Sequence, residues 1–156
     1  MTHMSKRPVD WDDFVSQYQT RLYRTAFGIL GNAQSAEDAV QDTFLKYLER
    51  APDFSVPAQE AAWLTKVTVN RCLSDLRSPW HRRVDPLPPD LPCQARQELE
   101  ELYQLPPKDR AVLHLYYYEG YSTEEIARML RLSPGSIRSR LSRARQKLKT
   151  LLEEGG

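Results

Sequence analysis

The residues with the clearest chemical potential lie near the C-terminus of this 156-residue chain, where long cations alternate with short hydroxyls. Between residues 138 and 149 there are six basic side chains and no acidic one, a density typical of a surface that meets phosphate. Arginine can bridge O6 and N7 of guanine, and small serines let a helix sit deep in the major groove. The face predicted to read duplex DNA carries Arg138, Ser139, Ser142 and Arg143. A solvated helical surface is the alternative for the basic run taken alone.

Two helices joined by a tight turn are predicted to hold this face. Ser122 and Glu125 form a capping box that starts a short helix, and a turn at Arg131 follows. Ser133 is a good N-cap, with Pro134 at the first position of a final helix that runs to about residue 152. Its packing side gathers Ile137, Leu141, Ala144, Leu148 and Leu151. The pattern predicts a helix-turn-helix, preceded by a helix over 108–119 in which Tyr116, Tyr117 and Tyr118 are partly buried.

A second chemical stripe lies on a helix predicted over 59–77. Its core side carries Ala62, Val69, Cys72, Leu73 and Leu76, and its other side Trp63, Val67, Asn70, Ser74 and Arg77. An aromatic ring and three hydrogen-bonding groups on one line can stack on and pair with unpaired bases. Packing of Trp63 against the preceding helix, with the polar groups merely solvated, is the equally weighted alternative.

A third stripe is acidic. A first helix is predicted from about Phe14 to the stop at Gly31-Asn32, and Ser35 then opens a second helix that runs to about Arg50. The second helix packs through Val40, Phe44, Tyr47 and Leu48. Its opposite side, predicted to be exposed, carries Asp38, Gln41, Asp42, Leu45 and Glu49.

Proline marks the division between these parts. Five of the eleven prolines fall between residues 78 and 97, where no helix is expected. The predicted fold is therefore all-α: two small helical domains, at 10–78 and 98–153, joined by a Pro-rich linker at 79–97. Residues 106–156 carry 10 Lys or Arg against 6 Asp or Glu, so the positive charge gathers in the second domain. Residues 1–4 carry no weight in the predicted fold, because the sequence leaves open whether they are a cloning remnant before a start at Met4.

The composition excludes several classes of function. No apolar run approaches the roughly 18 residues of a membrane span, so no membrane insertion and a soluble, cytoplasmic protein are expected. Cys72 and Cys93 with three histidines match no familiar zinc spacing, and no metal or cofactor is expected. Without a Gly-rich phosphate loop, a nucleophile elbow, a metal-ligand cluster or a histidine beside a candidate nucleophile, the sequence predicts no catalytic residues and no enzyme.

Three segments together resemble a known family. The run SAEDAVQDTFL at 35–45, the helix around Trp63, Asn70 and Arg77, and the stretch from Leu105 to Leu152 are similar to regions two and four of bacterial sigma factors. The two-domain form, covering about residues 12–152, resembles the extracytoplasmic function (ECF) group. This resemblance implies an alternative sigma factor that binds RNA polymerase core and directs promoter-specific transcription initiation.

The resemblance also implies roles for particular residues. Asp38, Gln41 and Asp42 would meet the clamp helices of the polymerase largest subunit. The single-stranded DNA of the minus-ten element would be held by Trp63, Asn70, Ser74 and Arg77, and the loop 53–57 could contribute. The minus-thirty-five duplex would be read by Arg138, Ser139, Ser142 and Arg143, with phosphate contacts from Arg140, Arg145 and Lys147. Further implied partners are the polymerase flap, promoter DNA and an anti-sigma factor.

Two departures and one competing function accompany the resemblance. Leu48 stands where the family usually has an aromatic residue, with Tyr47 beside it. Arg131 stands where the family's turn often has glycine, and a non-glycine residue at positive φ costs on the order of 1 kcal/mol. The competing function is a stand-alone helix-turn-helix regulator that binds duplex operator DNA without polymerase.

Overall fold

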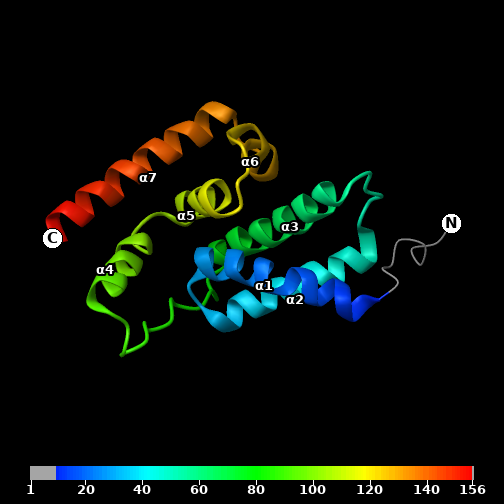
Figure 1. The fold of residues 1–156 in the computed structure, drawn as a ribbon, viewed down its shortest axis with the longest axis horizontal. Coiled ribbons are helices and arrows are strands. Elements are labelled where there is room, and N and C mark those ends of the chain that lie inside the picture. The colour runs from blue at the N-terminus through cyan, green and yellow to red at the C-terminus, as the bar shows by residue number, and fades with distance from the viewer. Residues whose placement is uncertain (1–9, 156) are drawn as a thin grey trace. The chain divides into compact units, whose positions relative to one another are not determined.

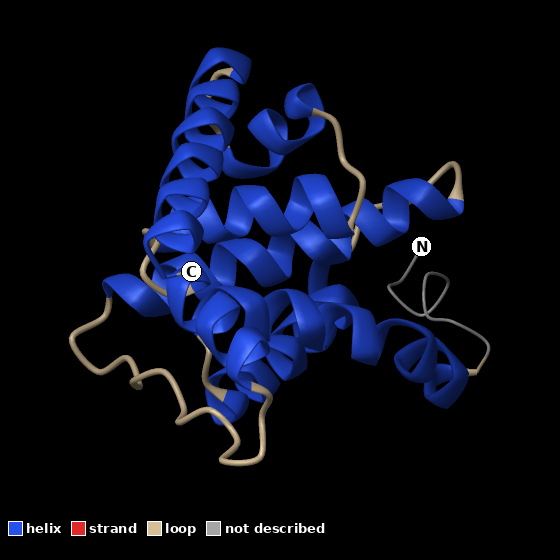
Figure 2. Ribbon diagram, turned by 60° about the vertical axis from the view of Figure 1, so that its left-hand side comes forward, coloured by secondary structure: helices blue, strands red, loops and turns tan. Residues whose placement is uncertain are grey.

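The computed structural model describes the chain from residue 10 to residue 155, and its side chains from 10 to 149. Within that part every regular element is a helix and no strand occurs (Figure 2), so the predicted all-α class is confirmed. The chain divides at Arg82 into two compact units. Residues 1–4, whose origin the sequence leaves open, lie outside the described residues. No helix in the described part is long and apolar enough to cross a membrane.

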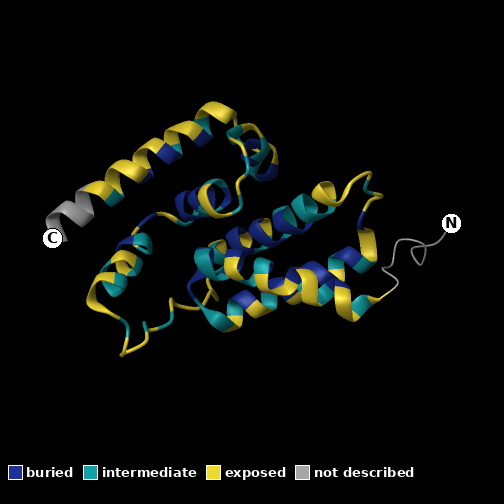
Figure 3. Ribbon diagram, in the orientation of Figure 1, coloured by how far each residue is buried: buried dark blue, intermediate teal, exposed yellow. Residues whose placement is uncertain are grey.

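The first unit is a bundle of three helices that all contact one another (Figure 1): α1 (Trp11–Leu30), α2 (Ala33–Arg50) and α3 (Pro57–Arg77). Figure 3 shows the buried residues on the inward side of each helix. The core includes Leu22, Ala26, Ile29, Ala36, Ala39, Leu64, Val69 and Cys72, each no more than 1% exposed. Burial raises the pKa of the Cys72 thiol to about 12, with a smaller contribution from the charge of Asp75. Cys72 is thus a small core side chain, as predicted.

Four threonines are buried in the same bundle, which the apolar pattern alone does not predict. Thr25, Thr43, Thr65 and Thr68 are each 1% exposed or less. Each hydroxyl bonds to the carbonyl four residues earlier in its own helix, at 2.9–3.2 Å. The hydroxyls of Thr43 and Thr68 also lie 2.8 Å apart, which links α2 to α3. Burial is tolerated because every one of these polar groups has a partner.

Two helix starts differ from those predicted. Gly31 ends α1 at φ 66°, a conformation that glycine adopts without strain, and Asn32 caps α2 by accepting a hydrogen bond from the Ser35 backbone N–H at 2.9 Å. Ser35, predicted as the capping residue that opens that helix, therefore lies inside it. Helix α3 starts at Pro57, two residues earlier than predicted, because proline at the first position loses no helical hydrogen bond.

The second unit contains α4 (Cys93–Leu102), α5 (Pro107–Leu113), the π-helix η2 (His114–Tyr118), α6 (Thr123–Leu130) and α7 (Pro134–Gly155). Helix α7 packs against α4, α5 and α6. Residues 93–97, predicted as linker, are helical because α4 begins directly after Pro92, whose ring sits just outside the first turn. The non-helical linker is correspondingly shorter.

The helix predicted over 108–119 is present, but its last part widens into the π-helix. Leu115 points into the core, whereas Tyr117 and Tyr118 are 54% and 81% exposed. The prediction that these two tyrosines are partly buried is therefore wrong, since the wider turn rotates them outward. Tyr116 is half-buried as predicted. Gly120, at φ 75°, ends the segment.

Candidate functional site

The helix-turn-helix in the second unit is built by two caps and one strained turn. Ser122 and Glu125 exchange the two hydrogen bonds of a capping box, which confirms the predicted start of α6. Arg131 ends that helix at φ 57°, so the turn does hold a non-glycine residue in the left-handed region. Ser133 Oγ accepts from the Ser136 backbone N–H at 3.1 Å and caps α7. The turn thereby fixes the start of α7.

Helix α7 presents one polar face and buries the other. Ile137, Leu141 and Ala144 are at most 2% exposed. Leu148 is half-buried, and the side chain of Leu151 lies outside the described residues. The exposed side carries the four predicted duplex readers Arg138, Ser139, Ser142 and Arg143. An exposed face of arginines and short hydroxyls has the composition that a major-groove helix needs.

All three residues predicted to contact phosphate make contacts within the unit. Arg140 Nη1 donates to Asp109 Oδ1 at 2.9 Å, and the Asp109 side chain is only 9% exposed. Arg145 lies over the ring of Tyr117, 5.4 Å from its centroid, and donates to its hydroxyl. Lys147 is exposed and makes one 3.3 Å hydrogen bond to the Gln104 carbonyl. The sequence pattern could not separate these cations, because it carries no information on Asp109 thirty-one residues away.

The second stripe divides into a packed end and an exposed end. Trp63 makes edge-to-face contacts with Tyr47 at 6.0 Å and Phe54 at 6.3 Å between ring centroids. Trp63 thus packs against the preceding helix, as one part of the alternative predicted, and its minus-ten role stays a prediction. Farther along α3 the remaining polar members of the stripe, Asn70, Ser74 and Arg77, are exposed.

The negative charge of the acidic stripe on α2 is partly offset by ion pairs that the sequence does not reveal. Asp38 pairs with Arg82 at 3.1 Å, and Asp42 pairs with both Lys46 and Arg71 at 2.9 Å. Partial burial would raise the pKa of Asp42, but the hydrogen bonds from Lys46 and Arg71 outweigh it and the pKa is lowered. Both carboxylates are half-exposed and neutralised by cations of the same unit. Gln41, between them, is exposed.

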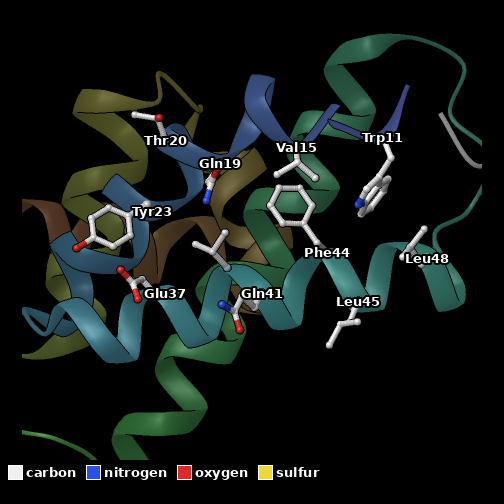
Figure 4. Close-up of a pocket in the computed structure, with 11 residues that line it drawn as sticks. Trp11, Val15, Gln19, Thr20, Tyr23, Glu37, Gln41, Phe44, Leu45 and Leu48 are labelled. Carbon is white, nitrogen blue, oxygen red and sulfur yellow. The ribbon is translucent and has the colours of Figure 1, made fainter. Parts of the chain in front are cut away.

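Beside Gln41 lies a groove that the sequence analysis missed (Figure 4). It runs between α1 and α2, has a volume of about 860 Å³, and is lined mainly by apolar side chains. Trp11 and Val15 line it from α1, and Phe44 and Leu48 from α2. Leu45, which is 60% exposed, lies on its rim. A leucine inside a polar stripe was the available signal for an apolar contact surface.

A three-helix bundle with an exposed polar stripe, together with a helix-turn-helix unit bearing an arginine-rich helix, defines a two-part nucleic-acid-binding protein. Comparison with known proteins narrows the class. Sigma-70 region 2 matches residues 14–82, and Sigma-70 region 4 matches residues 96–148. The chain belongs to the ECF RNA polymerase sigma factors.

Curated relatives carry the same family name. The chain is 33% identical to ECF RNA polymerase sigma factor SigE of Mycolicibacterium smegmatis, over 91% of this chain and 61% of that protein. It is 30% identical to ECF RNA polymerase sigma factor SigM of Mycobacterium tuberculosis, over 96% of this chain and 81% of that protein. It thus spans less than two thirds of the first relative's length and about four fifths of the second's.

Solved structures share the fold. The sigma factor RpoE of Bartonella quintana, crystallised with the anti-sigma factor NepR, aligns with a TM-score of 0.74 at 24% identity, over 92% of this chain and 97% of that one. CnrH, solved with the cytosolic domain of CnrY, aligns with a TM-score of 0.67 at 27% identity, over 93% of this chain and 88% of that one.

Proposed function

We propose that this protein binds RNA polymerase core in the cytoplasm and directs it to specific promoters, acting as a regulator of initiation and not as an enzyme. The observation that carries the proposal is the presence of both sigma-70 regions, in order, on the two compact units of one chain. The first unit is assigned to core binding and minus-ten recognition and the second to the minus-thirty-five duplex. The bounds 10–78, 79–97 and 98–153 stay predictions, with α4 starting inside the middle one.

The exposed face of α7 is assigned to the duplex. Arg138 and Arg143 would read guanine edges or hold phosphates, with Ser139 and Ser142 allowing close approach. Replacing either arginine by alanine is expected to weaken minus-thirty-five binding by about 1–3 kcal/mol, selectively on the preferred sequence if the side chain reads a base. Equal losses on every sequence would show phosphate contact only.

The exposed end of the α3 stripe is assigned to single-stranded minus-ten DNA. Asn70, Ser74 and Arg77 supply hydrogen bonds and one cation at solvent-facing positions. Asn70→Ala is expected to leave duplex binding intact and to reduce permanganate reactivity of the melted region. Unchanged permanganate reactivity would remove Asn70 from the assignment. Trp63 stays in the assignment as a half-buried ring that packs on Tyr47 and Phe54 at the other end of the stripe.

The α1–α2 groove and Gln41 are assigned to the polymerase clamp. Because Asp38 and Asp42 are paired internally, reversing their charge would disturb the bundle as well as an interface, and Gln41 is the cleaner position. Gln41→Arg is expected to weaken assembly with core, since it places a buried charge at an apolar contact. Gln17→Arg is the matched control, because Gln17 is an exposed glutamine of α1 that does not line the groove.

Two further partners belong to the proposal. An anti-sigma factor is proposed because the structural relative RpoE was solved with the anti-sigma factor NepR, and CnrH was solved with the cytosolic domain of CnrY. The polymerase flap is proposed as a contact of the second unit by family resemblance alone. Neither is assigned to particular residues.

Transcription in vitro, with purified core and a pool of promoter fragments, is the deciding experiment. The expected result is initiation from a subset of fragments that depends on both the protein and core. A protein that ignores core and binds its own duplex site tightly would instead be a stand-alone helix-turn-helix regulator.

A further inference from the structure

A tryptophan stands in solvent directly after the α3 stripe. Trp80 is 88% exposed, the largest exposed fraction of any large apolar side chain in the described part of the chain. An indole usually buries its ring and pairs its N–H, so such exposure calls for a contact that the isolated chain lacks. Trp11 and Trp63, by contrast, both pack into the aromatic cluster of the bundle.

The backbone around Trp80 is held in place. The backbone N–H of Trp80 donates to Ser78 Oγ at 3.1 Å, and the backbone N–H of His81 donates to the Ser78 carbonyl at 3.3 Å. Two residues on, Arg82 pairs with Asp38 of α2 at 3.1 Å. The turn is therefore tied to the bundle on both sides of the indole, and the ring is presented outward from a defined position.

Beside the indole is a hollow of about 250 Å³ with both donors and acceptors. Its polar lining includes Ser35, Asp38, Arg71, Asp75 and Arg82. Its two carboxylates and two guanidinium groups are paired with one another, Asp38 with Arg82 and Asp75 with Arg71, so the lining offers no excess positive charge to a phosphate. The edge of a nucleobase carries donors and acceptors together and can pair with a mixed lining of this kind. The hollow thus suits a base better than a phosphate.

We infer that Trp80 is a stacking platform for one unpaired nucleobase, whose edge meets the adjoining hollow. Asn70, Ser74 and Arg77 form an exposed line on α3 that leads toward the turn, so the strand held there would continue onto the indole. Aromatic stacking on a base does not depend on its identity, because every base has a π-face. The inference rests on the proposed function, and it adds a base-binding position beyond the α3 stripe.

The test uses holoenzyme assembled from core and the full chain, with forked promoter probes whose exposed strand carries an abasic nucleotide at one position at a time. For the unaltered protein, one abasic position is expected to reduce affinity on the order of tenfold. Trp80→Ala is expected to show the same loss on the intact probe and no further loss at that abasic position, since both changes remove one contact. Trp80→Phe should recover most of the affinity.

Tyr118→Ala is the control, since Tyr118 is another strongly exposed aromatic (81%) but lies in the second unit. It is expected to leave the abasic profile unchanged. The inference is overturned if Trp80→Ala gives the same abasic profile as the unaltered protein. It is also overturned if Trp80→Ala weakens assembly with core while leaving probe binding by assembled holoenzyme intact, since the indole would then contact protein. Failure of the unaltered chain to assemble with core overturns the proposed function first, and this inference with it.

Discussion

Arg140 and Arg143 lie on the same helix, α7, but only Arg140 is paired with Asp109. We therefore expect Arg140 to stabilise the second unit and Arg143 to bind DNA. Arg140→Met keeps much of the aliphatic stem and removes the charge, and Asp109→Asn removes the opposite charge. We expect both changes to destabilise the second unit, with Arg140→Met the more damaging. It leaves a carboxylate whose side chain is 9% exposed, whereas the arginine, at 23%, can turn toward water.

The expected loss of stability lies between the values known for exposed and for buried ion pairs. Exposed ion pairs contribute about 0.2–1 kcal/mol, and breaking a fully buried pair costs about 3–5 kcal/mol. This pair is nearly buried at one end and partly exposed at the other, so Arg140→Met is expected to cost about 2 kcal/mol. In the double variant the two losses should not add, because no charge is left unpaired.

The assay exploits the distribution of tryptophan. Trp11, Trp63 and Trp80 all precede the division at Arg82, so tryptophan fluorescence follows unfolding of the first unit alone. Amide hydrogen exchange in α5 and α7 follows the second unit. Arg140→Met should accelerate that exchange by roughly thirtyfold, the equivalent of about 2 kcal/mol, and leave the fluorescence midpoint unchanged.

For DNA binding we expect Arg143→Met to have the larger effect and Arg140→Met the smaller. Arg143→Met is expected to reduce the slope of log affinity against log salt by about one, as loss of one phosphate contact does, and Arg140→Met to leave the slope unchanged. The reasoning is refuted if Arg140→Met lowers the slope as Arg143→Met does while exchange in α5 and α7 stays at its original rate.

Three other variants test the fold. Thr43→Val should cost about 0.5–1.5 kcal/mol in the first unit by removing the hydrogen bond between α2 and α3, since the Thr68 hydroxyl keeps the Leu64 carbonyl as its partner, and adding Thr68→Val should cost less than Thr68→Val alone; fluorescence-monitored urea unfolding measures both. Arg131→Gly should stabilise the second unit by up to about 1 kcal/mol by relieving a positive φ, visible as slower hydrogen exchange. Burial lowers the pKa of His114, so the unfolded chain binds its proton more readily and stability should fall as pH drops below about 6.5. His114→Phe should remove that pH dependence while keeping the stack on Tyr118, and an unaltered pH profile would contradict the assignment.

Helical periodicity and capping chemistry predicted most of the fold, because both depend on neighbours within a few residues. The capping box at Ser122, the stop at Gly31 and the positive φ of Arg131 were all predictable in this way. The start of α2 was misjudged where two capping residues, Asn32 and Ser35, competed within one turn. Local sequence does not decide such a contest, since either side chain satisfies the same free N–H groups.

The candidate site was less predictable, because charge pairing is a long-range property. Helical periodicity correctly predicted that Arg138 and Arg143 are exposed. It could not show that Arg140 pairs with Asp109, or that Asp38 pairs with Arg82 forty-four residues away. The Tyr117 and Tyr118 rings were misplaced because a π turn advances the register of a helix without any change in composition.

Contacts within the second unit engage some of its basic residues and leave others exposed. Six basic residues lie between 138 and 149, but Arg140 and Arg145 are engaged by Asp109 and by tyrosine. Near the turn, Arg128 and Arg138 both lie close enough to Glu124 to lower its pKa, adding to the hydrogen bonds from its own backbone and Thr123 that contribute most. Arg128 is exposed and lies outside the basic run. Asp109 offsets the charge of Arg140 while Arg128 adds a cation near the turn, so we expect the DNA-contacting surface of this unit to extend toward the start of α7, where a recognition helix places its base-reading side chains.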